Sequence, residues 1–148
     1  CIRDRIKVDC SLFPAARAHG GLPSFGEAVP TIGERNGQSI KLFPINTRSI
    51  FGKKIIYSGG GYFRLMPASL LRRWFGSDEY VMTYFHPRDF DPGQPMVPGL
   101  GPVRRFKSYV GIRGAKDKLR QLLESNTFTD VRSASQAVDW NSVPQFGL

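Results

Sequence analysis

The hydrophobic pattern of the chain is most continuous between Tyr80 and His86, where apolar or weakly polar side chains occupy both alternating sets of positions. Such a run is typical of a parallel strand that is covered on both faces. Pro87 follows at once and cannot donate a ladder hydrogen bond, so the strand is expected to stop there. The pattern therefore predicts a buried strand with His86 at its carboxyl end.

Two other segments carry apolar residues at the spacing of an amphipathic helix. The first follows Pro67, a residue that a first helical turn tolerates, and the pattern predicts a helix over residues 68–75 with Gly76 as its C-cap. The second helix is predicted over residues 115–125. The apolar positions are Met66, Leu70, Leu71 and Trp74 in the first segment and Leu119, Leu122 and Leu123 in the second.

The remaining pattern predicts short strands, loops and one more helical turn. Residues 14–37 are rich in Gly and Pro and are expected to form a long irregular loop, of the kind that makes functional rims or lids. The tail after Asn141 is expected to be unanchored. Short strands are expected at residues 6–8, 40–45, 54–57 and 128–131, and a turn of helix at residues 133–138. This order of strands and helices predicts the α/β class, in one domain over residues 1–148.

Length and composition fit one globular core. The chain has 148 residues, of which 41% are hydrophobic and 12% aromatic, and no low-complexity tract suggests disorder. No apolar run approaches the roughly 20 residues that span a bilayer. Because the chain begins with Cys1 and opens without a signal-peptide pattern, we expect an interior or carboxyl-terminal piece of a longer protein, whose location stays open.

The formal charge of +9 raises the expectation of an anionic partner such as nucleic acid, anionic lipid or an acidic glycan. The charges are scattered, however, and no recognition-helix or zinc-finger pattern accompanies them, which makes nucleic acid an unlikely partner. Basic residues alternate with aromatic ones over residues 104–110, a pattern that binds single-stranded nucleic acid in some proteins but more often forms a solvated wall. Cys1 and Cys10 have no metal-ligand spacing with His19 or His86, so a metal site built from this chain would be poor in ligands.

Three stretches carry candidate chemistry. The first is Ser58–Arg64, where Gly59, Gly60 and Gly61 allow close approach of a ligand to the main chain, and where Tyr62 and Arg64 offer a flat ring and a forked donor that suit a sugar. It is not a phosphate-binding loop, because no lysine and Ser/Thr follow at the required spacing. The alternative is a tight turn that leads into a helix.

The other two stretches are strand ends. His86 would lie at the carboxyl end of its strand, where α/β proteins bind ligands, and the charged cluster of residues 88–92 follows it. The alternative is a histidine that only ends a strand. Asp9 and Ser11 follow the first short strand in the same way, and their alternative is a simple turn.

The segments SGGGYFRLMP and YFHPRDFDP resemble the carboxyl-terminal half of the polysaccharide deacetylase family with NodB homology. They resemble in particular the branch found in bacterial exopolysaccharide and O-antigen gene clusters. The runs VDCSLFP, KLFPIN and RRFKSYVGIRGAKDKLRQLLES are similar to that branch and lie in the same order. The resemblance thus covers nearly the whole chain.

The resemblance implies the carboxyl-terminal part of a distorted (β/α) barrel with a metal-dependent deacetylase site. It implies a divalent metal, zinc or similar, held by one Asp and two His in amino-terminal motifs that do not occur here. The metal would therefore be a cofactor of the complete enzyme, with no metal ligands in this chain. A barrel of this kind needs about 250 residues, so 148 residues would be only part of it.

The resemblance also implies roles for two residues. Asp9, in KVDCS, resembles the acid of the family's fourth motif, which helps to orient the catalytic base, and His86, in VMTYFHP, resembles the histidine that protonates the leaving group. The expected substrate is an acetylated sugar in a bacterial surface polysaccharide or its precursor, with Tyr62, Arg64 and the three glycines bordering the sugar. The alternatives are a non-catalytic glycan-binding module and, less expected, a basic nucleic-acid-binding domain that uses residues 104–109.

Overall fold

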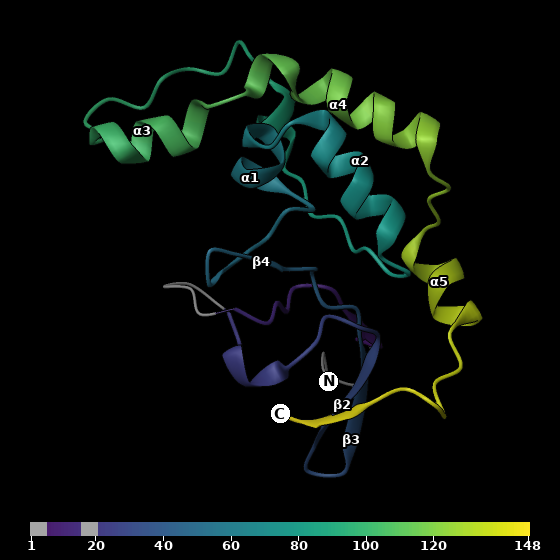
Figure 1. The fold of residues 1–148 in the computed structure, drawn as a ribbon. Coiled ribbons are helices and arrows are strands. Elements are labelled where there is room, and N and C mark those ends of the chain that lie inside the picture. Colours follow the sequence, from purple (N-terminus) through teal and green to yellow (C-terminus); the bar gives the residue numbers. More distant parts are fainter. Residues whose placement is uncertain (1–5, 16–20) are drawn as a thin grey trace. The chain divides into compact units, whose positions relative to one another are not determined.

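The computed structural model describes residues 6–15 and 21–148 (Figure 1). Cys1 and His19 lie outside the described residues. The chain divides into two compact units, one made of Cys1–Ile55 with Phe128–Leu148 and the other of Ile56–Thr127. Helices and a mixed sheet are both present, which confirms the α/β class; the single domain over residues 1–148 stays a prediction.

The first unit is built on a four-stranded mixed sheet with the strand order β1-β3-β2-β6. Strands β2 and β3 are antiparallel, whereas β1 pairs with β3 and β6 pairs with β2 in parallel. A separate two-stranded sheet is formed by β4 and β5. The strands are β1 (Val8–Asp9), β2 (Thr31–Arg35), β3 (Gln38–Leu42), β4 (Arg48–Ile50), β5 (Lys53–Ile55) and β6 (Gln145–Gly147), and the helices of this unit are η1 (Pro23–Phe25) and α5 (Val131–Ala137).

Three predictions for this unit were wrong. The segment 14–37 is not one irregular loop, because it contains β2, which turns into β3 through Asn36 and Gly37, both with positive φ. Asn-Gly is the sequence that such tight hairpin turns prefer. The tail after Asn141 is anchored, since β6 adds a strand beside β2. Residues 128–131 form no strand; the side chain of Asp130 instead accepts a hydrogen bond from the backbone of Ser133 and caps α5.

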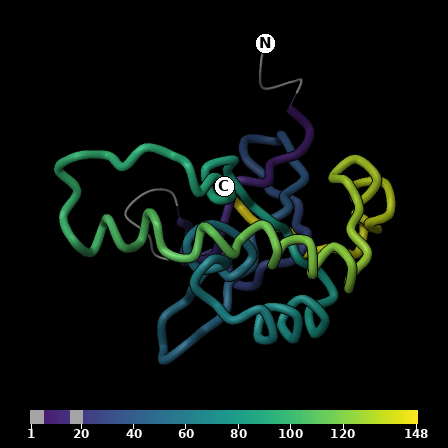
Figure 2. The backbone as a smooth tube through the Cα atoms, turned by 90° about the horizontal axis from the view of Figure 1, so that it is seen from above, coloured from purple at the N-terminus to yellow at the C-terminus, as the bar shows by residue number. Residues whose placement is uncertain are grey.

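The second unit is mainly helical and carries its own core. Figure 2 shows the loop that leads from η2 out to α3, from which the chain returns through α4. The helices are α1 (Gly60–Leu65), α2 (Ala68–Ser77), η2 (Pro87–Phe90), α3 (Pro102–Tyr109) and α4 (Ile112–Ser125). The buried core residues are Tyr57, Phe63, Leu71, Phe75 and Leu122.

Both predicted helices are present in this unit, with small differences at their ends. Helix α2 begins at Ala68 as predicted, but Gly76 lies inside it and Asp78 is the C-cap. Helix α4 begins three residues before the predicted start, after Gly111. No helix of the described residues is long and apolar enough to cross a bilayer.

The predicted strand Tyr80–His86 is the main error. The segment has only an isolated bridge, in which the backbone N–H of Tyr84 donates to the carbonyl of Ser58 at 3.3 Å. The partner of this bridge is the turn before helix α1, which is not a strand. The apolar character of the segment has another cause: Phe85 packs on Phe63 in the core, whereas Tyr84 and His86 are exposed.

Candidate functional site

The glycines before α1 lie against backbone of other segments. A Cβ atom added to Gly59 would lie 1.9 Å from the carbonyl oxygen of Tyr84, so this residue must be glycine for the two segments to approach. Gly60 begins α1 with a φ of 58°, a left-handed conformation that glycine adopts at little cost. A Cβ on Gly61 would lie 3.3 Å from the carbonyl oxygen of Lys107. The structure thus has a tight turn leading into a helix here, and the role of these glycines beside a sugar stays a prediction.

Arg64 is buried, with 5% of its side chain exposed. Its Nε atom lies 3.3 Å from Oδ1 of Asp89, and its other two nitrogens donate to the carbonyl oxygens of Ser108 at 2.9 Å and Lys107 at 3.2 Å. Burial lowers the pKa of the Arg64 guanidinium, and the neighbouring Asp89 opposes that change. The guanidinium therefore faces protein groups, while Tyr62, two residues earlier, is half-buried.

Asp89 connects this buried arginine to His86. Its Oδ2 atom accepts a hydrogen bond of 3.0 Å from the backbone N–H of His86, and its own backbone N–H donates to the carbonyl of His86 at 2.8 Å. An acid three residues after the start of a turn that opens with proline is a known capping pattern, so the segment His86-Pro87-Arg88-Asp89 carried a signal for this contact. The sequence did not reveal that Arg64 would be the partner of Asp89.

The imidazole of His86 lies outside this buried pair and is exposed. Its ring makes an edge contact with the ring of Tyr84, with centroids 4.9 Å apart and planes at 82°. Tyr84 is itself 47% exposed, so the two rings stand side by side on an accessible face of the second unit. An exposed imidazole can exchange protons with water and reach a bound molecule.

The backbone carbonyl of Arg64 also makes close contacts, with Lys118 and Gly111. The Nζ atom of Lys118 donates to the carbonyl oxygens of Arg64 and Met66, each at 2.6 Å, which satisfies acceptors at the end of α1. Burial lowers the pKa of Lys118. A Cβ on Gly111 would lie 2.4 Å from the same carbonyl of Arg64, so the start of α4 packs directly on it.

Asp9 belongs to the first unit, whereas the other predicted site residues belong to the second. Its Oδ1 atom accepts hydrogen bonds from the backbone N–H of Ser11 at 2.8 Å and from the Ser11 hydroxyl at 2.7 Å. This is a local turn at the end of β1, the simpler of the two interpretations of these residues. Its role in a catalytic site stays a prediction.

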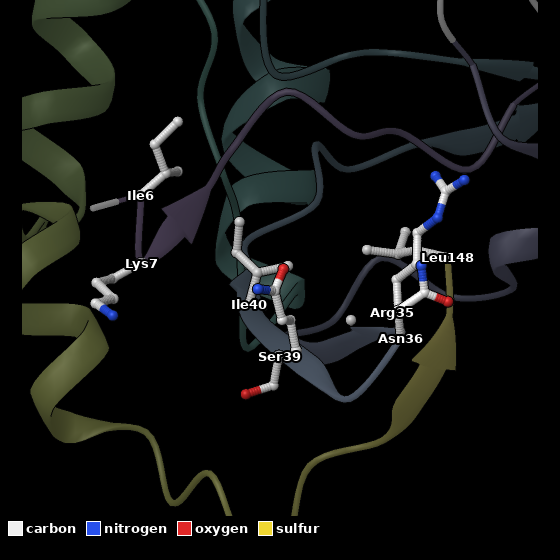
Figure 3. A pocket seen from close by; sticks show the side chains of 9 residues that line it. Ile6, Lys7, Arg35, Asn36, Ser39, Ile40 and Leu148 are labelled. Carbon is white, nitrogen blue, oxygen red and sulfur yellow. The ribbon is translucent and has the colours of Figure 1, made fainter. Parts of the chain in front are cut away.

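The sheet of the first unit carries a pocket of about 620 Å³ (Figure 3). Apolar side chains of Ile6, Ile40 and Leu148 and the cations Lys7 and Arg35 are among the residues that line it. None of the predicted site residues lines this pocket.

No metal site is formed within residues 6–15 and 21–148. No three His, Cys, Asp or Glu side chains of these residues gather closely enough to hold an ion. The divalent metal that the resemblance implies for the complete enzyme stays a prediction.

Comparison with known proteins places the chain in a family. The model of the family described as "Domain of unknown function (DUF3473)" matches residues 10–136. No curated protein and no solved structure matches the chain. Since the family model covers most of the sequence, the chain belongs to the family described as Domain of unknown function (DUF3473).

Proposed function

We propose that this chain is the carboxyl-terminal part of a polysaccharide deacetylase, which removes acetyl groups from a sugar of a bacterial surface polysaccharide or its precursor. The proposal includes the family's distorted (β/α) barrel as the fold of the complete enzyme. It is supported by the resemblance of SGGGYFRLMP and YFHPRDFDP to that family. The observation that carries it is the position of His86. Its imidazole is exposed, and its backbone N–H donates to the buried side chain of Asp89.

The role of His86 is that of a general acid. When an acetylated sugar is hydrolysed, the bond between the acetyl carbon and the sugar nitrogen or oxygen breaks, and the departing atom takes the electron pair. An amine or alkoxide is a poor leaving group unless it receives a proton, which the imidazolium of His86 would donate. Histidine is the side chain that most often donates a proton in this way, and an exposed ring can reach the leaving group.

The residues that would border the sugar are Tyr84, which contacts His86, and the residues of the glycine turn. The exposed ring of Tyr84 offers a flat apolar face, and Tyr62 and Gly59–Gly61 belong to the turn that Tyr84 contacts through its backbone. Arg64 has a different position, because its guanidinium is buried among protein acceptors. Its contribution would be indirect.

A divalent metal, zinc or similar, belongs to the proposal for the complete enzyme, with ligands outside this chain. The described residues gather no donor set for it, so no step assigned to these residues passes through a metal.

The test replaces His86 in the complete protein that carries this chain. His86→Ala and His86→Gln should lower turnover on an N-acetylated oligosaccharide by about 100- to 10,000-fold, the usual effect of losing a general acid. Turnover of p-nitrophenyl acetate should change little, because its leaving group needs no proton. Arg120→Gln, at an exposed side chain of α4, is the control and should be active on both substrates. Equal losses on both substrates, or a loss of bound metal, would show that His86 is not the acid.

A glycan-binding module without catalysis is the second candidate. The exposed Tyr84 ring beside the His86 imidazole favours it, because aromatic faces bind sugars without any chemistry. The two functions differ in one measurement: a binding module would take up the oligosaccharide in calorimetry and release no acetate.

A further inference from the structure

We propose that Asp89 and Arg64 are positioning residues for His86, in which the buried carboxylate fixes the backbone at His86 and the guanidinium fixes the carboxylate. The inference rests on the proposed function, since it concerns the residue assigned there as the acid. Neither residue is proposed to contact the sugar.

The first step of the argument is the position of His86 along the chain. The residue lies where the extended segment ends and η2 begins, with φ of −105° and ψ of 149°. At such a junction the direction of the side chain depends on how the backbone is held. Both main-chain polar groups of His86 are bonded to Asp89, the N–H to Oδ2 and the carbonyl oxygen to the N–H.

The second step is that Asp89 is itself immobilised. It is 4% exposed, and its second oxygen faces Nε of Arg64 at 3.3 Å. The remaining nitrogens of Arg64 donate to the carbonyls of Lys107 and Ser108, at the end of α3. The carboxylate is therefore held by a hydrogen bond within the turn that contains it and by the charge of a guanidinium anchored on another helix, whose Nε lies close to it without making a hydrogen bond.

The third step concerns the free-energy cost of burying the Arg64–Asp89 ion pair. Two charges removed from water lose hydration, and apolar residues of similar volume often give equal or greater stability at such places. Stability alone is thus a weak reason for a buried Arg64–Asp89 pair. Fixing the direction from which His86 leaves the backbone is a stronger one, because proton transfer requires hydrogen-bond geometry.

The ring of Tyr84 makes the position of His86 measurable. The two rings are 4.9 Å apart at 82°, so the tyrosine ring current displaces the imidazole proton signals from their positions in a free histidine. If the backbone of His86 were no longer fixed, the imidazole would move relative to the Tyr84 ring. The chemical shifts of its protons would then approach those of a free histidine. The change reports position and does not depend on enzymatic activity.

The experiment compares two double variants of the complete protein, labelled selectively at histidine. Arg64→Met/Asp89→Leu removes both charges and the acceptor for the N–H of His86. Arg64→Met/Asp89→Asn removes the charges but keeps an acceptor. His86→Gln identifies the His86 signal by its disappearance, and the exposed ion pair on α4 supplies the control, Arg120→Met/Asp117→Leu.

If Asp89 positions His86, the leucine variant should stay folded but lose the ring-current displacement of the His86 signals. Its turnover on the acetylated sugar should fall by about 100-fold, the effect of a misplacement of roughly 1 Å, with little change on p-nitrophenyl acetate. The asparagine variant should recover only part of the displacement and turnover, because it restores an acceptor for the N–H of His86 but not the guanidinium that holds it. Full recovery would show that Arg64 does not position His86. The control should resemble the wild type in both measurements.

Two outcomes would overturn the inference. In the first, the leucine variant keeps the His86 signals and full turnover. In the second, both double variants lose signals and both activities together with melting temperature, which is the result of a purely structural pair. If the protein has no deacetylase activity at all, the proposed function fails, and the histidine spectra still decide whether Asp89 fixes His86.

Discussion

Replacing Gly59 with alanine should destabilise the second unit through a single steric contact, with the backbone of Tyr84. The backbone φ of Gly59 is −173°, an extended conformation open to any residue, so the effect of Gly59→Ala is steric alone. The new Cβ would lie 1.9 Å from the carbonyl oxygen and 2.8 Å from the carbonyl carbon of Tyr84. Both are backbone atoms, which cannot turn aside as the end of a flexible side chain can.

The size of the effect follows from this contact. Real Cβ atoms essentially never come nearer than 3.0 Å, so the Tyr84 carbonyl would have to retreat by roughly 1 Å. Overpacking of this kind costs about 1–3 kcal/mol, and losing the hydrogen bond from Tyr84 to Ser58 costs about 1 kcal/mol more. We expect Gly59→Ala to lower the free energy of unfolding by about 3 kcal/mol.

Gly60→Ala is the matched control at the next position. Nothing lies within 4 Å of its added Cβ, and the cost is only that of a left-handed φ of 58°, about 1 kcal/mol. Urea unfolding followed by Trp74 fluorescence reports on this unit, because Trp74 packs on Tyr57 in its core. A Trp140→Phe background removes the other tryptophan.

With a slope of about 2 kcal/mol per M, the urea midpoint should fall by roughly 1.5 M for Gly59→Ala and by roughly 0.5 M for Gly60→Ala. If Gly59→Ala costs no more than Gly60→Ala, the close approach of Gly59 to Tyr84 is not a feature of the folded protein. The proposed placement of His86, two residues beyond Tyr84, would then lose one of its supports.

Two further predictions concern the contacts around the carbonyl of Arg64. Gly111→Ala combines a φ of 69° with a Cβ 2.4 Å from that oxygen and should cost about 3 kcal/mol in urea unfolding, whereas Gly114→Ala, with open space at its Cβ, should raise stability by up to about 1 kcal/mol; equal effects would contradict the packing of α4 on Arg64. Lys118→Met should change how stability depends on pH. Because burial lowers the pKa of Lys118 from 10.5, the unfolded state binds more protons just below pH 10.5, and this residue makes stability rise with pH in that window. The rise should be smaller in Lys118→Met, and an unchanged slope between the two proteins would refute the partly buried position of Lys118.

Helices α2 and α4 were predictable because their signal is local, whereas α1 was not predicted. The spacing of leucine and aromatic residues marks α2 and α4 without reference to the rest of the chain, and the errors are a few residues at the ends. The prediction of a strand over Tyr80–His86 was wrong because an apolar run indicates that a segment is buried but does not indicate which segment packs against it. Strand β6 is three residues long and is defined by its pairing with β2, so the local sequence pattern could not predict it.

In the candidate site too, some features were predictable from the local sequence and others depend on contacts between distant residues. His86 and the glycines stand out in the sequence as residue types with special chemistry or backbone freedom, and the structure brings Gly59 against the backbone of Tyr84, two residues before His86. The pairing of Arg64 with Asp89 joins two helical segments that no periodicity relates. An arginine two residues after a tyrosine suggests a side chain that donates to a ligand, whereas the packing of α1 buries the side chain of Arg64.

The direction of Arg64 changes how its motif is interpreted. Removing one partner of a buried ion pair costs about 3–5 kcal/mol, because the other charge is left without compensation, so Arg64→Ala alone would be expected to weaken folding rather than only sugar binding. Loss of activity in that variant would say nothing about contact with a substrate. The double variants with Asp89 avoid this ambiguity, since they remove both charges and leave the hydrogen bond to His86 as the difference between them. Arg64 is thus better understood through the residue it holds than through the sugar that a guanidinium in this motif suggests.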